Sequence, residues 1–279
     1  MRMRAVVLLV FLLTTLFFDS CASRERSVVL SLALTPGMEK TMKISTEQHL
    51  SGANPGGSTF ISFTYKFHVI SVSASGVAKV ESSVLDVTAA KGIPEAAAYI
   101  ESLRRQKFVV TVDARGRVLD MSTDQPGGVA LPGLPRAPGS SSQMAPAQGD
   151  IGAFFEGLNG QRVSVGETWT SPLSPSGGSG LRGTLRWTLA SVGGSTARLD
   201  YTGTLEKQQV PLPSLPDSAQ AFLSGDATGF VELEKETGWP RHGKMVIHAN
   251  VSLPEKSAAA GSTAVLVSMG IVTQFDAVR

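Results

Sequence analysis

The feature that most constrains the fold of this chain is an alternation of apolar and polar residues within many short segments. Between Phe60 and Val69, Ile, Phe, Tyr, Phe and Val alternate with Ser, Thr, Lys and His. Successive side chains of a β-strand point to opposite faces of a sheet, so this pattern predicts a strand with one buried face. An amphipathic helix would instead repeat its apolar residues every three or four positions. The chain is therefore expected to bury the face of a sheet.

The same alternation recurs along the chain between turn residues such as Pro36-Gly37 and Ser75-Gly76. Short turns join antiparallel neighbours, so we expect an antiparallel sheet. A charged content of 17% and 29 glycines also favour sheet and turn over a helix bundle. The expected strands are 28–34, 40–49, 60–73, 77–88, 108–112, 118–121, 163–170, 181–192, 197–207, 230–234, 244–253 and 264–275.

Three short segments between the strands carry helix signals. Pro94 is suited to the first position of a helix over 94–105, in which Tyr99, Ile100 and Leu103 form an apolar stripe. A shorter helix is expected over 216–223, and Asp150 would cap a third over 151–158. Two or three short helices are therefore expected beside the sheet.

The two halves of the chain match each other in places. The segment 94–97 aligns with 216–219, and the same offset aligns Phe108 with Phe230 and Gly116 with Gly238. This register predicts an internal duplication, with a chance match among common residues as the alternative. The predicted division is a first β repeat over 21–124, a Pro/Gly/Ser-rich linker over 125–149 and a second β repeat over 150–279, the two repeats forming one domain.

The N-terminus has the form of an export signal. Arg2 and Arg4 precede an apolar run over 5–18 that is too short to span a bilayer, and small residues follow it. Residues 1–20 are therefore predicted to be a signal peptide. Cys21, the only cysteine, stands where a bacterial lipoprotein is cleaved and acylated, although Asp19 is unusual there. The alternative is ordinary cleavage after Ala22 or Ser23. Both place the protein in the bacterial cell envelope, either lipid-anchored, with the outer membrane favoured, or periplasmic.

Several function classes find no support in the sequence. The formal net charge of +2, without a basic face, argues against nucleic-acid binding. The four histidines show no metal-ligand spacing, and no Gly-x-Ser-x-Gly motif occurs. Residues 238–244 match most of a phosphate-binding loop, but Met245 replaces the magnesium ligand and a strand pattern follows it. We expect no enzyme activity, metal or cofactor, with an enzyme of an unrecognised kind as the alternative.

Short motifs resemble an uncharacterised family of bacterial exported β proteins. They are Thr35-Pro36-Gly37 after an apolar strand, the segment Val165 to Trp169, and the strand that ends in Thr237-Gly238. More distantly, the strand running through Asp113 to Val118 resembles lipoprotein carriers of the LolA and LppX type. That resemblance implies a mainly β fold: a curved, incompletely closed antiparallel sheet, here built from two duplicated halves, with the short helices covering its concave side. It also implies that acyl chains are held there.

The predicted function is a non-catalytic envelope lipoprotein that binds an apolar or lipid-like ligand between sheet and helices. Its partners would be the membrane, through the lipid anchor, and this ligand. The alternatives are that the same residues simply fill a core, or that the protein is an interaction or scaffold module with no ligand. The expected lining residues are Phe63, Tyr65, Phe67, Tyr99, Ile100, Leu103, Trp187, Leu189 and Phe222.

Overall fold

The computed structural model describes residues 26–51, 58–89, 101, 104, 107–123, 155, 157–173, 182–210, 221–252 and 267–278. In these residues the chain forms thirteen strands. They are β1 (Ser27–Val29), β2 (Glu39–Ser51), β3 (Ser58–Val72), β4 (Ala78–Ala89), β5 (Lys107–Val112), β6 (Val118–Thr123), β7 (Arg162–Ser164), β8 (Thr168–Leu173), β9 (Gly183–Val192), β10 (Thr196–Val210), β11 (Ala221–Glu234), β12 (Pro240–Ser252) and β13 (Val267–Val278).

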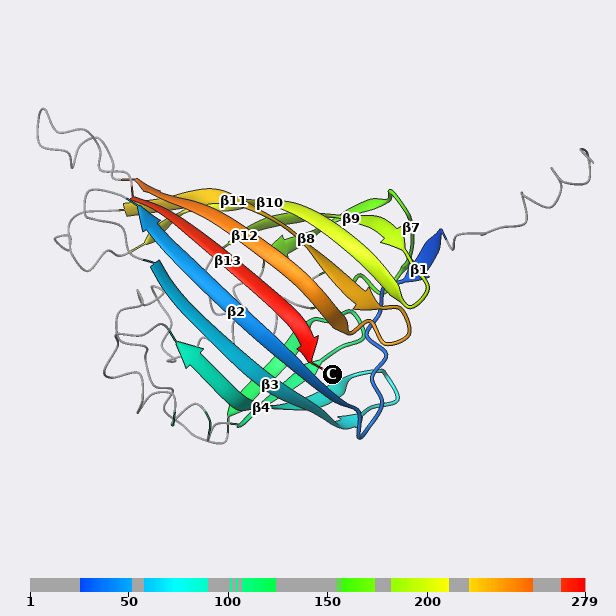
Figure 1. Ribbon diagram of the computed structural model, residues 1–279. Helices are drawn as coiled ribbons and strands as arrows, with labels where there is room; N and C mark the ends of the chain where they lie inside the picture. Colours follow the sequence, from blue (N-terminus) through cyan, green and yellow to red (C-terminus); the bar gives the residue numbers. More distant parts are fainter. Residues whose placement is uncertain are drawn as a thin grey trace, which may run out of the picture.

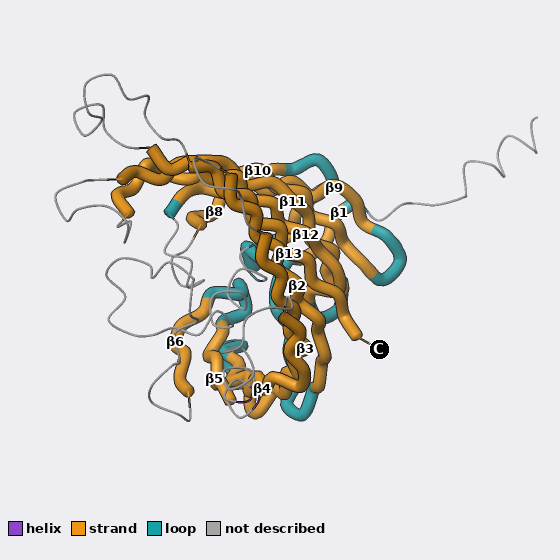
Figure 2. The backbone as a smooth tube through the Cα atoms, turned by 60° about the vertical axis from the view of Figure 1, so that its left-hand side comes forward, coloured by secondary structure: helices purple, strands orange, loops and turns teal. Residues whose placement is uncertain are grey.

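Eleven strands form one antiparallel sheet in the order β6-β5-β4-β3-β2-β13-β12-β11-β10-β9-β8. The last strand, β13, lies between β2 and β12 and so joins the first half of the chain to the second (Figure 1). The sheet curls strongly, and its edge strands β6 and β8 do not pair with each other (Figure 2). The predicted mainly β, curved and unclosed antiparallel sheet is therefore present.

The apolar alternation decides which face of each strand is buried. On β3, Phe63, Tyr65, Phe67 and Val69 are buried, whereas Thr64, Lys66 and His68 between them are partly exposed. The expected strand over 28–34 is shorter than predicted, because pairing stops at Val29 and the chain continues without a partner strand. The expected strand over 230–234 is only the end of β11.

The prediction of two or three short helices over the concave side is wrong for the part of the chain that the structure describes. The expected helix over 216–223 ends in residues 221–223, which belong to β11 and pair with β10, and 222–223 also pair with β12. In the expected helix over 151–158, Leu158 donates its amide to the carbonyl of Phe155 in a tight turn. Of the segment 94–105, only Glu101 and Arg104 are described, with helical backbone, and the rest lies outside the described residues.

The aligned phenylalanines of the two halves lie on corresponding strands but on opposite faces of the sheet. Phe108 is buried on the concave face, whereas Phe230 points to the convex face, where its ring contacts Arg198 and His242. Phe108 lies on β5 and Phe230 on β11, the fourth strands of the series β2–β6 and β8–β12, which follow one another in the same order along the sheet. Gly116 and Gly238, in the turns after these strands, both have positive φ, 74° and 67°. The division into repeats stays a prediction, and its boundaries, the signal segment 1–20 and the linker 125–149 lie outside the described residues.

One end of the sheet is closed by turns and by the small β1–β7 sheet. The six glycines with positive φ in the described residues all lie in or beside connections at this end: Gly37, Gly76, Gly116, Gly160, Gly166 and Gly238. We call it the closed end. The strand connections at the opposite end, such as 52–57 and 253–266, lie outside the described residues. Within the described part of the chain, no helix has the length and apolar character needed to cross a membrane.

Candidate ligand-binding face

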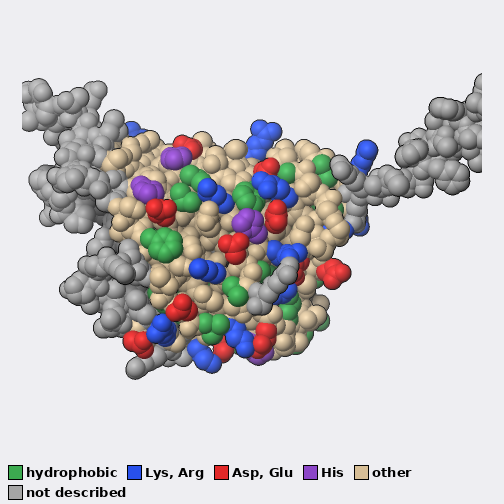
Figure 3. Space-filling view, in the orientation of Figure 1, with side chains coloured by type: hydrophobic (Ala, Val, Ile, Leu, Met, Phe, Trp, Pro, Cys, Tyr) green, Lys and Arg blue, Asp and Glu red, His purple; other side chains and the backbone are tan. Residues whose placement is uncertain are grey.

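The two faces of the curved sheet differ completely in charge. The pairing register places buried residues such as Ile44, Phe63, Leu199 and Val231 on one face, and described loop segments lie on the same, concave side (Figure 2). At paired positions of the described strands, Lys40 is the only charged side chain on this face. The convex face carries mixed lysine, arginine, aspartate, glutamate and histidine (Figure 3). The concave face is therefore an apolar surface with isolated hydroxyl and amide groups.

An aromatic row on β3 forms one wall of the concave face. The ring centroids of Phe63 and Tyr65 lie 5.6 Å apart, and those of Tyr65 and Phe67 lie 6.0 Å apart. Trp239 packs edge-on against both Phe67 and Phe155, at 5.3 and 5.5 Å. Ring contacts of this geometry stabilise a pair beyond the burial of its surface. Together these rings extend the hydrophobic core from β3 to the closed end of the sheet.

The opposite wall is built from β9 and β10. The ring of Trp187 lies 4.6 Å from that of Tyr201, and the Trp187 indole N–H donates to the hydroxyl of Ser171 at 2.9 Å. Gly157 lies so close to this wall that an added Cβ would meet Leu199 and Trp187 at 3.0 Å. The segment after Phe155 thus packs directly on the concave face.

Extended chain over 30–34 covers the closed end. Leu30 donates its amide to Gln161 and accepts from Gly160, Leu32 donates to Ala114, and Ala33 donates to Thr237. These bonds satisfy backbone groups that would otherwise be buried without partners, as a segment without a partner strand requires. Leu30, Leu32 and Leu34 are buried, so this segment serves as a plug.

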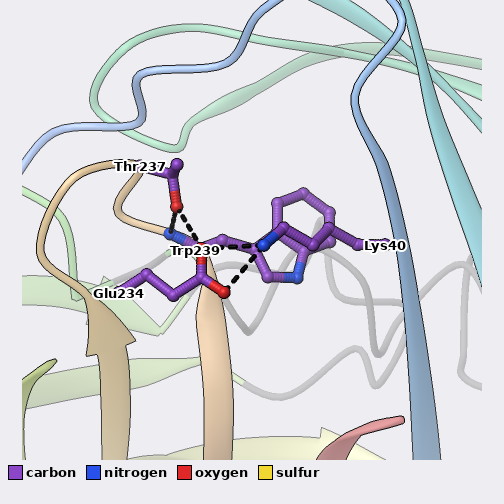
Figure 4. A network of polar contacts seen from close by, with 4 residues as sticks. All are labelled: Lys40, Glu234, Thr237 and Trp239. Atoms are coloured by element: carbon purple, nitrogen blue, oxygen red, sulfur yellow. Dashed lines mark hydrogen bonds and ion pairs between the residues drawn. The ribbon is translucent and has the colours of Figure 1, made fainter. Parts of the chain in front are cut away.

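An ion pair at the closed end links two strands of the sheet. The Lys40 ammonium, at the start of β2, donates to both carboxylate oxygens of Glu234 at 2.7 and 2.8 Å (Figure 4). Thr237 donates to the same carboxylate, and its hydroxyl accepts the backbone N–H of Trp239. Because β2 and β11 are separated by β13 and β12 in the sheet, the pair links elements that are not neighbours. The Lys40 charge, the only one at paired positions of the described strands on this face, is thereby neutralised.

Part of the concave face stays open to solvent. On β2, β12 and β13, the central strands, five uncharged inward-facing side chains are only half-buried: Thr46, Gln48, Met245, Met269 and Ile271. The Gln48 amide donates to the sulfur of Met269 at 3.0 Å, and the Thr46 and Thr273 hydroxyls bond to each other at 3.2 Å. We call these five residues the central patch. Its flexible thioethers suit apolar ligands of varied shape.

The residues that the sequence predicted fall into three groups. Phe63, Tyr65, Phe67, Trp187 and Leu189 share the concave face, but each is at most 3% exposed and therefore belongs to its packed walls. Phe222 points to the convex face, where the Lys207 ammonium lies 4.7 Å from its ring centroid, so the structure does not bring it to the others. Tyr99, Ile100, Leu103 and the acylation residue Cys21 lie outside the described residues.

Sequence reasoning missed the central patch. Its strands were expected, and alternation on β13 separates Met269 and Ile271 from their neighbours. The sequence does not show that β13 lies between β2 and β12. This position puts the two side chains at the middle of the curved sheet. No local pattern specifies which strands become central.

Several titratable groups of the described residues form pairs on the convex face or lie in turns. No three His, Cys, Asp or Glu side chains among them are placed to hold a metal ion. His49 lies 3.2 Å from Glu47, and His242 pairs with Asp276, both on the convex face. Burial alone would raise the pKa of Asp113, but hydrogen bonds from the side chain and backbone of Arg117 and the backbone of Arg115 outweigh it and lower this pKa. Asp113 lies in the turn between β5 and β6, so its lowered pKa reflects the hydrogen bonds of that turn.

Comparisons with known proteins agree with the coarse prediction. Residues 148–240, which run from before β7 to the start of β12, match a family of unknown function (DUF6263). This range includes two of the three motifs on which the resemblance to an uncharacterised family rests. No curated protein matches the chain.

Among solved structures, the chain is similar to lipovitellin, in a structure described as showing lipid–protein interactions. The TM-score is 0.49 at 9% identity, over 88% of this chain and 25% of that one. The present chain thus spans about a quarter of the length of that chain. A similarity at this level assigns no function, and the resemblance to carriers of the LolA and LppX type stays a prediction.

Proposed function

We propose that the protein is an exported, lipid-anchored envelope protein that binds an apolar or lipid-like ligand on the concave face of its sheet and catalyses no reaction. The observation that carries this proposal is the separation of charge between the two faces. An unclosed sheet whose inner face has no unpaired charge at its paired positions, but is partly open to solvent at the central patch, presents apolar surface to water. Burying such surface under an apolar ligand is favourable, at about 25 cal/mol per Å².

The export and anchoring parts of the proposal rest on the sequence. The signal over 1–20 and Cys21 at its end are the supporting features. The several acyl chains of a bacterial lipoprotein anchor a protein firmly, whereas a single chain binds only marginally. Mass spectrometry of the protein purified from its own cells is the test, with an acylated N-terminal Cys21 expected. A free N-terminus at Ala22 or Ser23 would exclude the anchor.

The ligand part is tested on the same preparation. Organic extraction should release an apolar molecule in near-stoichiometric amount, and the extracted protein should take up cis-parinaric acid, a fluorescent fatty acid. Ile271→Lys places a charge in the half-buried central patch and should reduce this uptake by at least about tenfold, because a charge is costly to cover with an apolar ligand.

The matched control is Val272→Lys. Val272 is the next residue of β13, equally half-buried, but it points to the convex face, where its register partner is Glu47. It should retain full uptake. No released molecule and no uptake by the wild-type protein, or equal losses in both variants, would reject the ligand and leave the scaffold function standing.

A further inference from the structure

The small β1–β7 sheet presents an exposed basic and apolar surface at the closed end. Val28 and Val163 are buried beneath it, while Val29 and Arg162, which face each other across the pair, point outward. Val29 is 40% exposed, and Val165 just beyond β7 is 44% exposed. Arg26 precedes β1, and the carbonyl of Arg26 accepts the amide of Val165. These residues therefore lie on or directly beside the β1–β7 pair.

Arg115 joins this surface from the β5–β6 turn. Its side-chain carbons lie against Gly160, where an added Cβ would meet the Arg115 Cγ at 3.0 Å, and Gly160 in turn bonds to Leu30 next to β1. We define the β1–β7 surface as Arg26, Val29, Arg115, Arg162 and Val165. Three arginines and two exposed valines thus surround the first described strand of the chain.

The three arginines are exposed and lack acidic partners in the described part of the chain. Asp113 and Glu167, which are close in sequence to Arg115 and Arg162, are engaged elsewhere: Asp113 binds Arg117 at 2.6 Å, and Glu167 accepts the amide of Ser164. Arg162 donates only to the Ser27 hydroxyl, at 3.4 Å. A guanidinium without a carboxylate is suited to phosphate, which it binds through two parallel hydrogen bonds.

The chain length between the anchor and β1 limits where this surface can lie. Six residue steps separate Cys21 from Ser27, and an extended chain of this length reaches about 20 Å at most. An acyl group on Cys21 would therefore hold the β1–β7 surface close to the bilayer.

We propose that the β1–β7 surface rests on the phospholipid headgroups of the anchoring membrane. The arginines bind lipid phosphates and the two valines enter the interfacial region, as in other surface-bound basic and apolar segments. This inference rests on the proposed lipid anchor. Its consequence is an orientation. The closed end faces the membrane, and Gln48 and Met269 lie near the far ends of their strands, away from the membrane. Ligand exchange would then occur with a partner on the far side, not with the anchoring bilayer.

The arginine contacts are tested on the mature chain carrying Cys21→Ser, which has no acyl group. We expect it to sediment with vesicles of phosphatidylcholine and phosphatidylglycerol in low salt, and to be released in 0.5 M NaCl. Arg115→Glu with Arg162→Glu should weaken this binding by at least about tenfold, since each basic residue at an anionic surface contributes measurably. The charge-matched control, Arg182→Glu with Arg186→Glu, changes exposed arginines just before and within β9 and should retain binding.

The orientation is tested in the acylated protein on vesicles that contain brominated lipid. A bimane label on Val165→Cys should be quenched, and a label on Ser51→Cys, at the far end of β2, should not. Equal quenching at both positions, or vesicle binding that the two double variants lose equally, would overturn the inference. Because the vesicle experiment uses no acyl group, its failure is distinct from failure of the anchor, which mass spectrometry of the N-terminus reports separately.

Discussion

At the scale of single residues, Asp113 organises the turn between β5 and β6. Its carboxylate accepts the backbone N–H groups of Arg115 and Arg117 at 2.9 and 3.0 Å and the Arg117 guanidinium at 2.7 Å. The same turn offers the Ala114 carbonyl to Leu32 of the plug. A single carboxylate therefore shapes a turn on which the closed end depends.

Asp113→Asn should lower the free energy of unfolding by about 2 kcal/mol at neutral pH, because hydrogen bonds to a charged group are lost. The pKa of Asp113 is lowered in the folded state, so its ionised form stabilises the fold above its unfolded pKa of about 3.9. This stabilisation is lost as the pH falls through the lower folded pKa. Urea unfolding of both proteins should give a constant difference above about pH 4 and a shrinking one below it. A difference that persists unchanged at pH 2 would contradict this account.

Two turn glycines allow backbone strain to be separated from packing. Gly37 has φ 81° and open space around it, whereas Gly238 has φ 67° and lies against the carbonyl of Ser31 in the plug. Gly37→Ala should lower the free energy of unfolding by about 1–2 kcal/mol, because alanine is strained at positive φ. Gly238→Ala should lower the free energy of unfolding by about 1–3 kcal/mol more, because its Cβ would clash with the backbone of Ser31, which cannot move aside easily. Gly194→Ala, with neither feature, is the control in the same chemical denaturation series. Equal losses at 37 and 238 would show that the plug does not pack tightly there.

At the scale of elements, β11 explains why a helix was predicted where a strand forms. Its inward positions are Ala221, Leu223, Gly225, Ala227 and Gly229, then Val231 and Leu233. Small residues weaken the apolar alternation, and the Ala-rich start of the segment favours a helix by propensity alone. The glycines are required by close packing: a Cβ on Gly229 would meet Tyr201 and the Lys244 carbonyl. Tertiary packing therefore decided that residues 221–223 form a strand. Strands such as β3, whose inward residues are large and apolar, could be predicted from the alternation alone.

The Lys40–Glu234 pair should couple β2 to the β11–β12 turn. Both side chains are about one-quarter exposed, at 26% and 25%, so solvent screens them only in part. A double-mutant cycle with Lys40→Met and Glu234→Gln should give a coupling energy of about 1 kcal/mol in thermal or urea unfolding. The exposed pair Lys66–Glu39, 2.9 Å apart but 41% and 55% exposed, is the control and should give less than about 0.5 kcal/mol. Equal coupling in both pairs would mean that the link across the sheet adds no stability.

At the scale of the whole molecule, the insertion of β13 between β2 and β12 determines the candidate site. Local alternation predicted most strands and the side of each that is buried, because those depend on neighbouring residues only. The strand order depends on pairing such as Phe275 with Ile44, between residues far apart in sequence. For that reason alternation assigns Tyr65 and Trp187 to the buried side of their strands, whereas the half-buried central patch could not be found.

Removal of the ligand should destabilise the whole domain. Met245, Met269 and Ile271 of the central patch and the walls around them offer apolar surface to a ligand. A ligand that binds only the folded state adds stability by mass action. At a free concentration of about one hundred times the dissociation constant, the gain is about 2.7 kcal/mol, and in a domain of this size each kcal/mol raises the melting temperature by about 2–4 °C. Delipidated protein should therefore melt about 5–10 °C below the same protein resupplied with oleate. Ile271→Lys should show little of this rise, and Val272→Lys should show all of it. A melting temperature that oleate leaves unchanged in the delipidated wild-type protein would mean that the concave face is a closed core.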